Sequence, residues 1–89
     1  MTEQLPAEVT VQYWAAARAA AGCDSEQCRA ATVAEALAIV AERHGDRLRA
    51  VLARCSFLVD GAPVGRRDHA SVQVSPSSVI EVLPPFAGG

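Results

Sequence analysis

The sequence predicts an α+β roll, in which one main helix packs on a mixed sheet of about five strands. The first and last apolar segments, residues 9–14 and 79–83, alternate apolar and polar side chains as half-buried strands do. Between them, residues 33–44 carry apolar side chains at helical spacing. With 89 residues, 51% of them hydrophobic, the chain can form one globular domain with a single core.

The chain is expected to enter the fold through a strand. Residues 1–7 are mostly polar, contain Pro6 and are expected to be flexible. Residues 9–14 then alternate as a half-buried strand. Its core-facing side chains would be Val9, Val11 and Tyr13.

A short helix and a second strand are predicted next. Residues 15–21 are nearly all alanine, the strongest helix former, and Gly22 suits the C-terminal cap. Residues 25–31 read as a strand with Cys28 and Ala30 on one face.

The main helix has the clearest signals. Thr32 and Glu35 form a capping box, in which the hydroxyl accepts from the amide of residue 35 and the carboxylate reaches back. Gly45 ends the helix, and His44 is expected to interact with the helix dipole or the last carbonyls. One apolar face follows, made of Val33, Ala36, Leu37, Val40, Ala41 and His44.

The second half of the chain is predicted to complete the sheet. Its segments are a short helix 46–54 capped by Asp46, a strand 55–60, a turn at Asp60-Gly61, a hairpin strand 62–65, a polar loop 66–69, a turn 75–78 and a strand 79–83. The inner side of the short helix would carry Leu48, Val51 and Leu52. With the first strand central and the last parallel to it, the topology is the β-grasp of ubiquitin-like proteins.

The last predicted strand leaves apolar side chains outside the core. With Ile80 and Val82 facing inward, Val79 and Leu83 would be exposed beside the tail. Phe86 would add a third apolar side chain. An apolar patch at the base of a tail is typical of a docking surface, and the alternative is that Phe86 folds back onto the domain.

The sequence ends in Pro84-Pro85-Phe86-Ala87-Gly88-Gly89. The prolines fix φ and donate no N–H, so they should lead the chain off the sheet in an extended path. The glycines lack a Cβ and allow close approach of a partner. Six extended residues reach about 20 Å, enough to enter another protein's buried site, whereas the alternative is a frayed end. We therefore divide the chain into a flexible N-terminus (1–7), a domain (8–83) and an extended tail (84–89).

Composition narrows the classes of function. The net charge is -2, with no basic stripe and few aromatic side chains, so no nucleic-acid partner is expected. No apolar run has the length of a membrane span, and the N-terminus shows no signal-peptide pattern. These features predict a cytoplasmic protein with no membrane partner.

The three cysteines, Cys23, Cys28 and Cys55, are an odd number without a secretion signal, so a disulfide framework is not expected. Together with His44 and His69 they do not show the spacing of a zinc site. Buried free thiols and no bound metal are expected, and any further role of the cysteines stays open. The chain has no lysine, so its own side chains cannot receive an isopeptide bond.

Several segments together carry a family resemblance. They are Tyr13-Trp14-Ala15-Ala16-Ala17-Arg18 with Gly22, Ala31-Thr32-Val33-Ala34-Glu35-Ala36-Leu37, His44-Gly45, Leu58-Val59-Asp60-Gly61 and Val82-Leu83-Pro84-Pro85-Phe86-Ala87-Gly88-Gly89. From residue 9 to the end, the chain resembles the MoaD/ThiS sulfur-carrier family, and within it the small subunits of molybdopterin synthase. Two positions depart from the family pattern: Asp60 replaces the usual asparagine, and residues 75–78 replace an Asp-Gly-Asp-like turn.

The resemblance implies a sulfur carrier. An E1-like adenylyltransferase would use ATP to adenylate Gly89, and a sulfur donor would convert it to a thiocarboxylate. The tail would then enter the large subunit of molybdopterin synthase, commonly in a heterotetramer, and donate sulfur to the pterin precursor. The chain would bind no cofactor and would act as a co-substrate rather than a catalyst. The implied site residues are Gly88 and Gly89 at the reacting end, with Val79, Leu83, Pro84, Pro85, Phe86 and Ala87 binding the partner.

Other functions fit the same tail. A carrier for cysteine, thiamin thiazole or tRNA thiolation would use identical chemistry with a different partner. A ubiquitin-like modifier would instead join Gly89 to lysines of target proteins, and in a plain interaction domain the tail would do nothing. A cysteine-nucleophile enzyme has little support, because no motif places a histidine near a cysteine.

Overall fold

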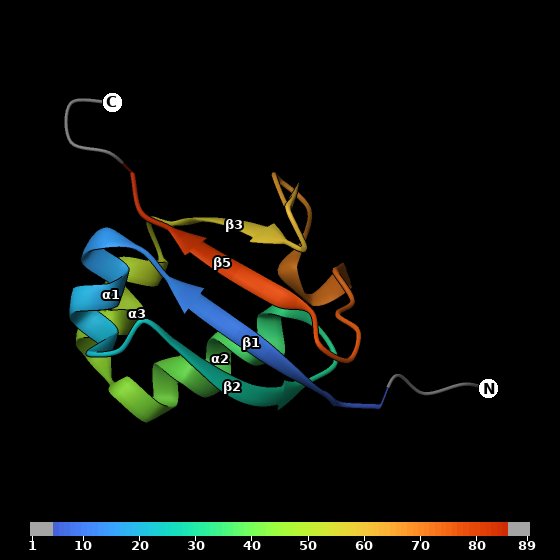
Figure 1. The fold of residues 1–89 in the computed structure, drawn as a ribbon. Helices are drawn as coiled ribbons and strands as arrows, with labels where there is room; N and C mark the ends of the chain where they lie inside the picture. Colours follow the sequence, from blue (N-terminus) through green and yellow to red (C-terminus); the bar gives the residue numbers. More distant parts are fainter. Residues whose placement is uncertain (1–4, 86–89) are drawn as a thin grey trace.

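The computed structural model describes residues 5–85 (Figure 1). The predicted order of helices and strands is confirmed, and a short 3-10 helix, η1, is added after the polar loop. The elements are β1 (Ala7–Tyr13), α1 (Ala15–Ala21), β2 (Ser25–Ala30), α2 (Val33–His44), α3 (Asp46–Leu52), β3 (Ser56–Val59), β4 (Ala62–Pro63), η1 (His69–Ser71) and β5 (Val79–Leu83). β1 begins at Ala7, the last residue of the segment that we assigned to the N-terminus.

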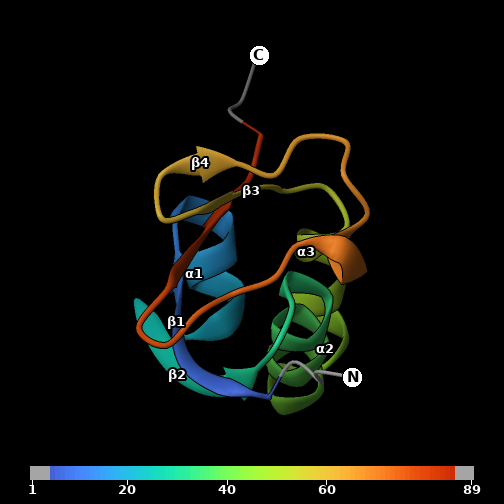
Figure 2. The same ribbon diagram turned by 90° about the vertical axis from the view of Figure 1, so that its right-hand side faces the viewer.

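The strands form one five-stranded sheet in the order β2-β1-β5-β3-β4. β1 and β5 are parallel neighbours, with Thr10 opposite Val79 and Tyr13 opposite Val82, and the other pairs are antiparallel. The helices lie on one side of the sheet, as the edge-on view shows (Figure 2). This arrangement confirms the α+β β-grasp architecture, with α1 and α3 as short helices beside the main helix α2.

The core lies between α2 and the inner face of the sheet. Val9, Val11 and Tyr13 of β1 are at most 1% exposed, as the alternation predicted. On α2 the buried side chains are Val33, Ala36, Val40 and Ala41, whereas Leu37 and His44 at the edge of this face are half-buried. Because burying one valine or leucine side chain contributes about 1.5–3 kcal/mol, this layer accounts for much of the stability.

Both ends of α2 were predicted, with one difference in the capping box. Thr32 Oγ1 accepts from the Glu35 amide at 3.2 Å. The Glu35 carboxylate, however, accepts from the amide of Ala31 at 2.8 Å rather than from that of Thr32. Thr32 lies in an isolated β-bridge with Gln73, whose hydrogen bonds use the carbonyl of Ala31 and the amide of Val33.

Two side chains at the α2–α3 junction have other partners than predicted. His44 Nε2 lies 2.5 Å from Glu26 Oε2 of β2, not on the last carbonyls of its helix. Asp46 does not cap α3: it is the first helical residue, and its carboxylate pairs with Arg49 at 2.8 Å. The backbone amide of Gly45 bonds to the Ala41 carbonyl, so the last turn of α2 is closed without His44. Gly45 occupies the N-cap position of α3, which leaves Asp46 inside the helix.

Asp60 connects the β3–β4 hairpin to the start of β5. Asp60 and Gly61 have φ values of 50° and 86°, as a two-residue hairpin turn requires. The Asp60 carboxylate accepts from the Val79 amide at 2.9 Å and from the Ser78 hydroxyl at 3.0 Å. Because an asparagine oxygen can also accept from an amide, aspartate at this position keeps the turn compatible with the family pattern.

Candidate functional site

The tail leaves the fold from the end of β5, the middle strand of the sheet. Ile80 and Val82 are fully buried beneath this strand, as predicted. Val79 and Leu83 on its other face are half-buried, so our expectation that they would be exposed is wrong. They lie opposite Thr10 of β1 and Ser56 of β3, whose strands flank β5 on both sides and cover part of each side chain.

The exposed apolar side chain nearest this end of the sheet is that of Trp14. It is 41% exposed, and Leu5 is the other large apolar side chain exposed within residues 5–85. The indole Nε1 donates to the Glu81 carboxylate at 3.2 Å, and the Trp14 amide donates to the Val82 carbonyl at 3.2 Å. Trp14 was not among the predicted site residues, although the alternation of β1 already places it on the face opposite Tyr13.

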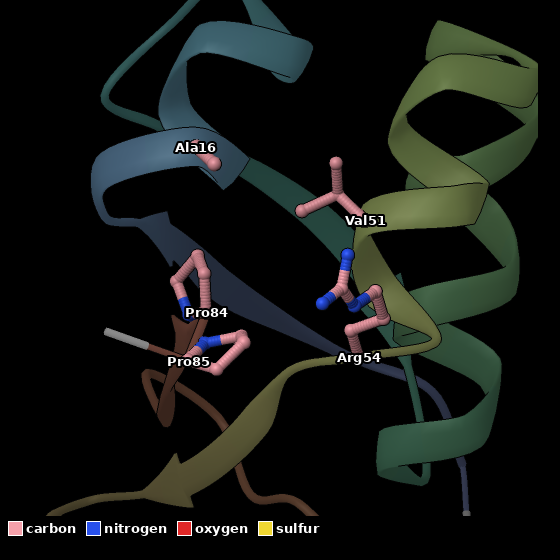
Figure 3. Close-up of a pocket in the computed structure, with 5 residues that line it drawn as sticks. All are labelled: Ala16, Val51, Arg54, Pro84 and Pro85. Atoms are coloured by element: carbon pink, nitrogen blue, oxygen red, sulfur yellow. The ribbon is translucent and has the colours of Figure 1, made fainter. Parts of the chain in front are cut away.

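A groove of about 170 Å³ lies where the chain leaves β5. We call it the tail groove; its lining residues are Ala16, Val51, Arg54, Pro84 and Pro85. The two prolines face Val51 and Arg54 at the end of α3, with Ala16 of α1 above them (Figure 3). The predicted partner-binding residues Pro84 and Pro85 thus line a groove together with α1 and the C-terminal end of α3.

Arg54 gives the tail groove its charge. Within the part of the chain that the structure describes, its guanidinium forms neither an ion pair nor a hydrogen bond. An unpaired guanidinium beside apolar side chains can bind a carboxylate of a partner in bidentate fashion. Sequence reasoning missed Arg54, because nothing in the local pattern of α3 places its end beside the tail.

Four predicted site residues, Phe86, Ala87, Gly88 and Gly89, lie outside the described residues. Their roles in docking and in the reaction therefore stay predictions. The described residues at the same end of the sheet offer an apolar surface with one free guanidinium. They contain no arrangement of acid, base and nucleophile beside the tail.

The cysteines are free thiols among residues 5–85. Cys28 is buried, and Cys55 Sγ donates to the Val51 carbonyl at 3.1 Å. Contrary to expectation, the structure does bring a histidine near a cysteine, because a ligand atom of His44 lies within 4.8 Å of Cys23 Sγ. Burial, with the carboxylates of Glu26 and Asp24, raises the pKa of Cys23, so its thiol is not activated as a nucleophile.

Several solved structures have a fold similar to that of this chain. Small archaeal modifier protein 1 of Methanosarcina acetivorans is 22% identical, with a TM-score of 0.82, over 94% of this chain and 98% of that one. A putative molybdopterin converting factor subunit 1 of Pyrococcus furiosus is 23% identical, with a TM-score of 0.75, over 90% and 99%. Subunit 1 in the Helicobacter pylori complex of molybdopterin-converting factor subunits 1 and 2 is similar at 22% identity and a TM-score of 0.69, over 92% and 99%.

Sequence comparison gives the family. No curated protein matches the chain with significance. Over residues 5–85, the structure contains no helix that is long and apolar enough to cross a membrane. The model of the ThiS family matches residues 11–89, which include the end of β1, all of β5 and the Gly-Gly end. The chain therefore belongs to the ThiS family, within the ThiS/MoaD group of ubiquitin-like β-grasp sulfur carriers.

Proposed function

We propose that this chain carries sulfur to the pterin precursor of molybdopterin, as a thiocarboxylate on Gly89. The observation that carries the proposal is the family match, which runs to residue 89 and so includes the Pro-Pro-x-x-Gly-Gly end. The similarity of the fold to two molybdopterin converting factor subunits supports this pathway over cysteine, thiamin thiazole or tRNA thiolation. The pathway would operate in the cytoplasm.

The chemistry needs no catalytic side chain on this protein. An E1-like adenylyltransferase would let the Gly89 carboxylate attack the α-phosphate of ATP, with pyrophosphate leaving. A sulfur donor would then displace AMP and leave a thiocarboxylate, an anionic sulfur nucleophile. ATP belongs to the activating enzyme, and the carrier itself would bind no cofactor. Holding the sulfur on a tethered tail removes part of the entropy cost of the later encounter.

The end of β5 supports delivery by the tail. Leu83 is fixed by pairing with Ser56, and the two prolines that follow restrict the path of the chain. Residues 86–89 then reach roughly 13–14 Å beyond Pro85 when extended. This reach suits insertion of Gly88 and Gly89 into the pterin site of a large subunit while the folded domain docks outside.

The docking surface we propose combines predicted and newly found residues. From the sequence it takes Val79, Leu83, Pro84, Pro85, Phe86 and Ala87. The structure adds Trp14 and the Arg54 side of the tail groove. The partner would be the large subunit of molybdopterin synthase, in a heterotetramer, and the Helicobacter pylori complex of subunits 1 and 2 supports such a pairing.

Arg54→Glu is expected to weaken binding of the large subunit at least about tenfold, which corresponds to about 1.4 kcal/mol. The substitution reverses the charge that we assign to a partner carboxylate, so it should act mainly on affinity. Isothermal titration with the purified large subunit measures the effect. Arg66→Glu makes the same charge change at an exposed position outside the tail groove and should bind normally. If both variants bind the large subunit with equal affinity, Arg54 is not part of the interface.

A second function, protein modification, is favoured by the likeness to small archaeal modifier proteins of Methanosarcina acetivorans and Haloferax volcanii. A modifier would use the same adenylate but pass Gly89 to a lysine amine of another protein. The two functions differ in the product at Gly89, which is a thiocarboxylate for the carrier and an isopeptide bond for the modifier.

Intact-mass measurement separates these functions. After incubation with ATP, a sulfide source and the E1-like enzyme of the same cells, we expect exchange of one oxygen for sulfur at Gly89. Omission of ATP is the control and should leave the mass unchanged. Gly89 found only in isopeptide bonds would favour the modifier, and an unmodified chain would contradict both functions.

A further inference from the structure

A cluster of three potential metal ligands lies away from the tail, at the edge of the sheet formed by β2. Cys23 precedes this strand, Glu26 lies within it, and His44 ends α2. One sulfur, oxygen or nitrogen ligand atom from each lies within 4.8 Å of the other two. None of the three contributes to the proposed sulfur transfer.

Glu26 is the centre of this cluster. It lies on the inner face of β2, where a carboxylate is unusual, and its side chain is only 15% exposed. Oε2 accepts from the Tyr13 hydroxyl and contacts His44 Nε2, both at 2.5 Å, while Oε1 accepts from Arg43 Nη1 at 3.0 Å. Burial alone would raise the pKa of Glu26, but these bonds outweigh it and lower the pKa, so the carboxylate is ionised.

The partners of Glu26 resemble the outer shell of a metal site. Ligand carboxylates in such sites are themselves hydrogen-bonded, which fixes their orientation. Tyr13 supplies one such bond from the core and Arg43 a second, to the oxygen that faces away from His44. Arg43 is held by the Gln27 carbonyl at 2.7 Å as well, so its charge is directed at Oε1.

We propose that Cys23, Glu26 and His44 bind a zinc ion, with a solvent molecule as the fourth ligand. Mixed sulfur, nitrogen and oxygen donors in tetrahedral array suit zinc among the common divalent ions. With metal–ligand bonds of about 2.0–2.3 Å, ligand atoms of a tetrahedral site lie about 3.3–3.7 Å apart. Small side-chain rotations would move Glu26 Oε2 and His44 Nε2 from 2.5 Å to those separations, and Cys23 Sγ already lies within 4.8 Å of a ligand atom of each.

Binding exchanges existing interactions for metal bonds. The contact between His44 and Glu26 is replaced by a bond from each to the ion. His44 would bind through Nε2 as a neutral imidazole that keeps one proton on Nδ1, and any second proton is released to solvent. The Cys23 thiol binds as a thiolate and releases its proton to solvent. The carboxylates of Glu26 and Asp24 that disfavour a bare thiolate at this position equally attract a cation to it. The ion would join the α1–β2 connection to the end of α2.

Cobalt absorption tests the site, because a tetrahedral Co²⁺ thiolate site gives a sulfur-to-metal charge-transfer band. The reduced, metal-free full chain is titrated with Co²⁺ and then with Zn²⁺. We expect the band to saturate at one equivalent of Co²⁺ and to disappear when Zn²⁺ is added. Zn²⁺ should also raise the melting temperature, because it binds the folded chain preferentially.

Cys23→Ser should remove both the charge-transfer band and the thermal shift. Cys55→Ser is the matched control and should keep both, because Cys55 is bonded to Val51 and lies outside the cluster. His44→Gln should lower the affinity for Co²⁺ at least about tenfold, and circular dichroism confirms that each variant is folded. A folded wild-type chain without the band, or a band that Cys23→Ser leaves unchanged, would overturn the proposal.

Discussion

One alanine added after Gly89 is expected to abolish thiocarboxylate formation while leaving the domain folded. The reacting group that we propose is the free carboxylate of Gly89, and an extra residue turns that carboxylate into an amide. The free carboxylate then belongs to the added alanine, one residue further out, and its Cβ prevents the close approach that a terminal Gly-Gly allows. Intact-mass measurement after incubation with ATP, sulfide and the activating enzyme gives the modified fraction directly.

The controls for this variant separate chemistry from folding. The extension lies beyond β5, so thermal unfolding should match that of the chain ending at Gly89. A chain shortened by Gly88 and Gly89 should also fold and should also remain unmodified. Full sulfur incorporation into the extended chain, with the added alanine still present in the mass, would contradict the proposed role of Gly89.

Leu48→Ala is expected to cause the largest loss of stability that we predict, about 2–5 kcal/mol. Leu48 is 0% exposed and fixes α3 to the core, so truncation leaves a cavity that the short helix cannot fill. Domains of this size have a free energy of unfolding of order 5–15 kcal/mol, of which this is a large share. Urea denaturation should show a lower midpoint, and the melting temperature should fall by about 10 °C or more.

Arg47→Ala on the same helix is the matched control. Its side chain is exposed and forms no ion pair within residues 5–85, so its effect should stay within about 0.5 kcal/mol. A comparable loss in both variants would contradict core packing by Leu48 as the cause, because alanine is the better helix former at both positions. Because α3 also carries Val51 at the tail groove, Leu48→Ala should weaken partner docking as a secondary effect.

Local signals account for most of the fold. The alternation of residues 9–14 predicted which side chains of β1 are buried, and Thr32 with Glu35 predicted where α2 begins. Asp60-Gly61 predicted the hairpin turn, because both residues must adopt positive φ there. In each case the interacting residues are neighbours in the chain, so the local sequence is enough to determine the local structure.

Contacts between distant segments could not be predicted in the same way. Glu26 contacts His44 across 18 positions and Tyr13 across 13, so a pattern within β2 or α2 alone does not show the pairing. The tail groove likewise combines α1, the end of α3 and the residues after β5. The half-burial of Val79 and Leu83 depends on both flanking strands, whereas the alternation of β5 only gives the face on which they lie.

The parallel pairing of β1 with β5 also bears on how the chain folds during synthesis. Thr10 pairs with Val79, so the central ladder joins the first and last strands of the domain. A nascent chain cannot complete its sheet until β5 has left the ribosome. Such non-local pairing slows folding relative to helical domains of equal length. The sheet should therefore close only after β5 has been made, and the activating enzyme that we propose would meet the tail on a folded domain only from that point on.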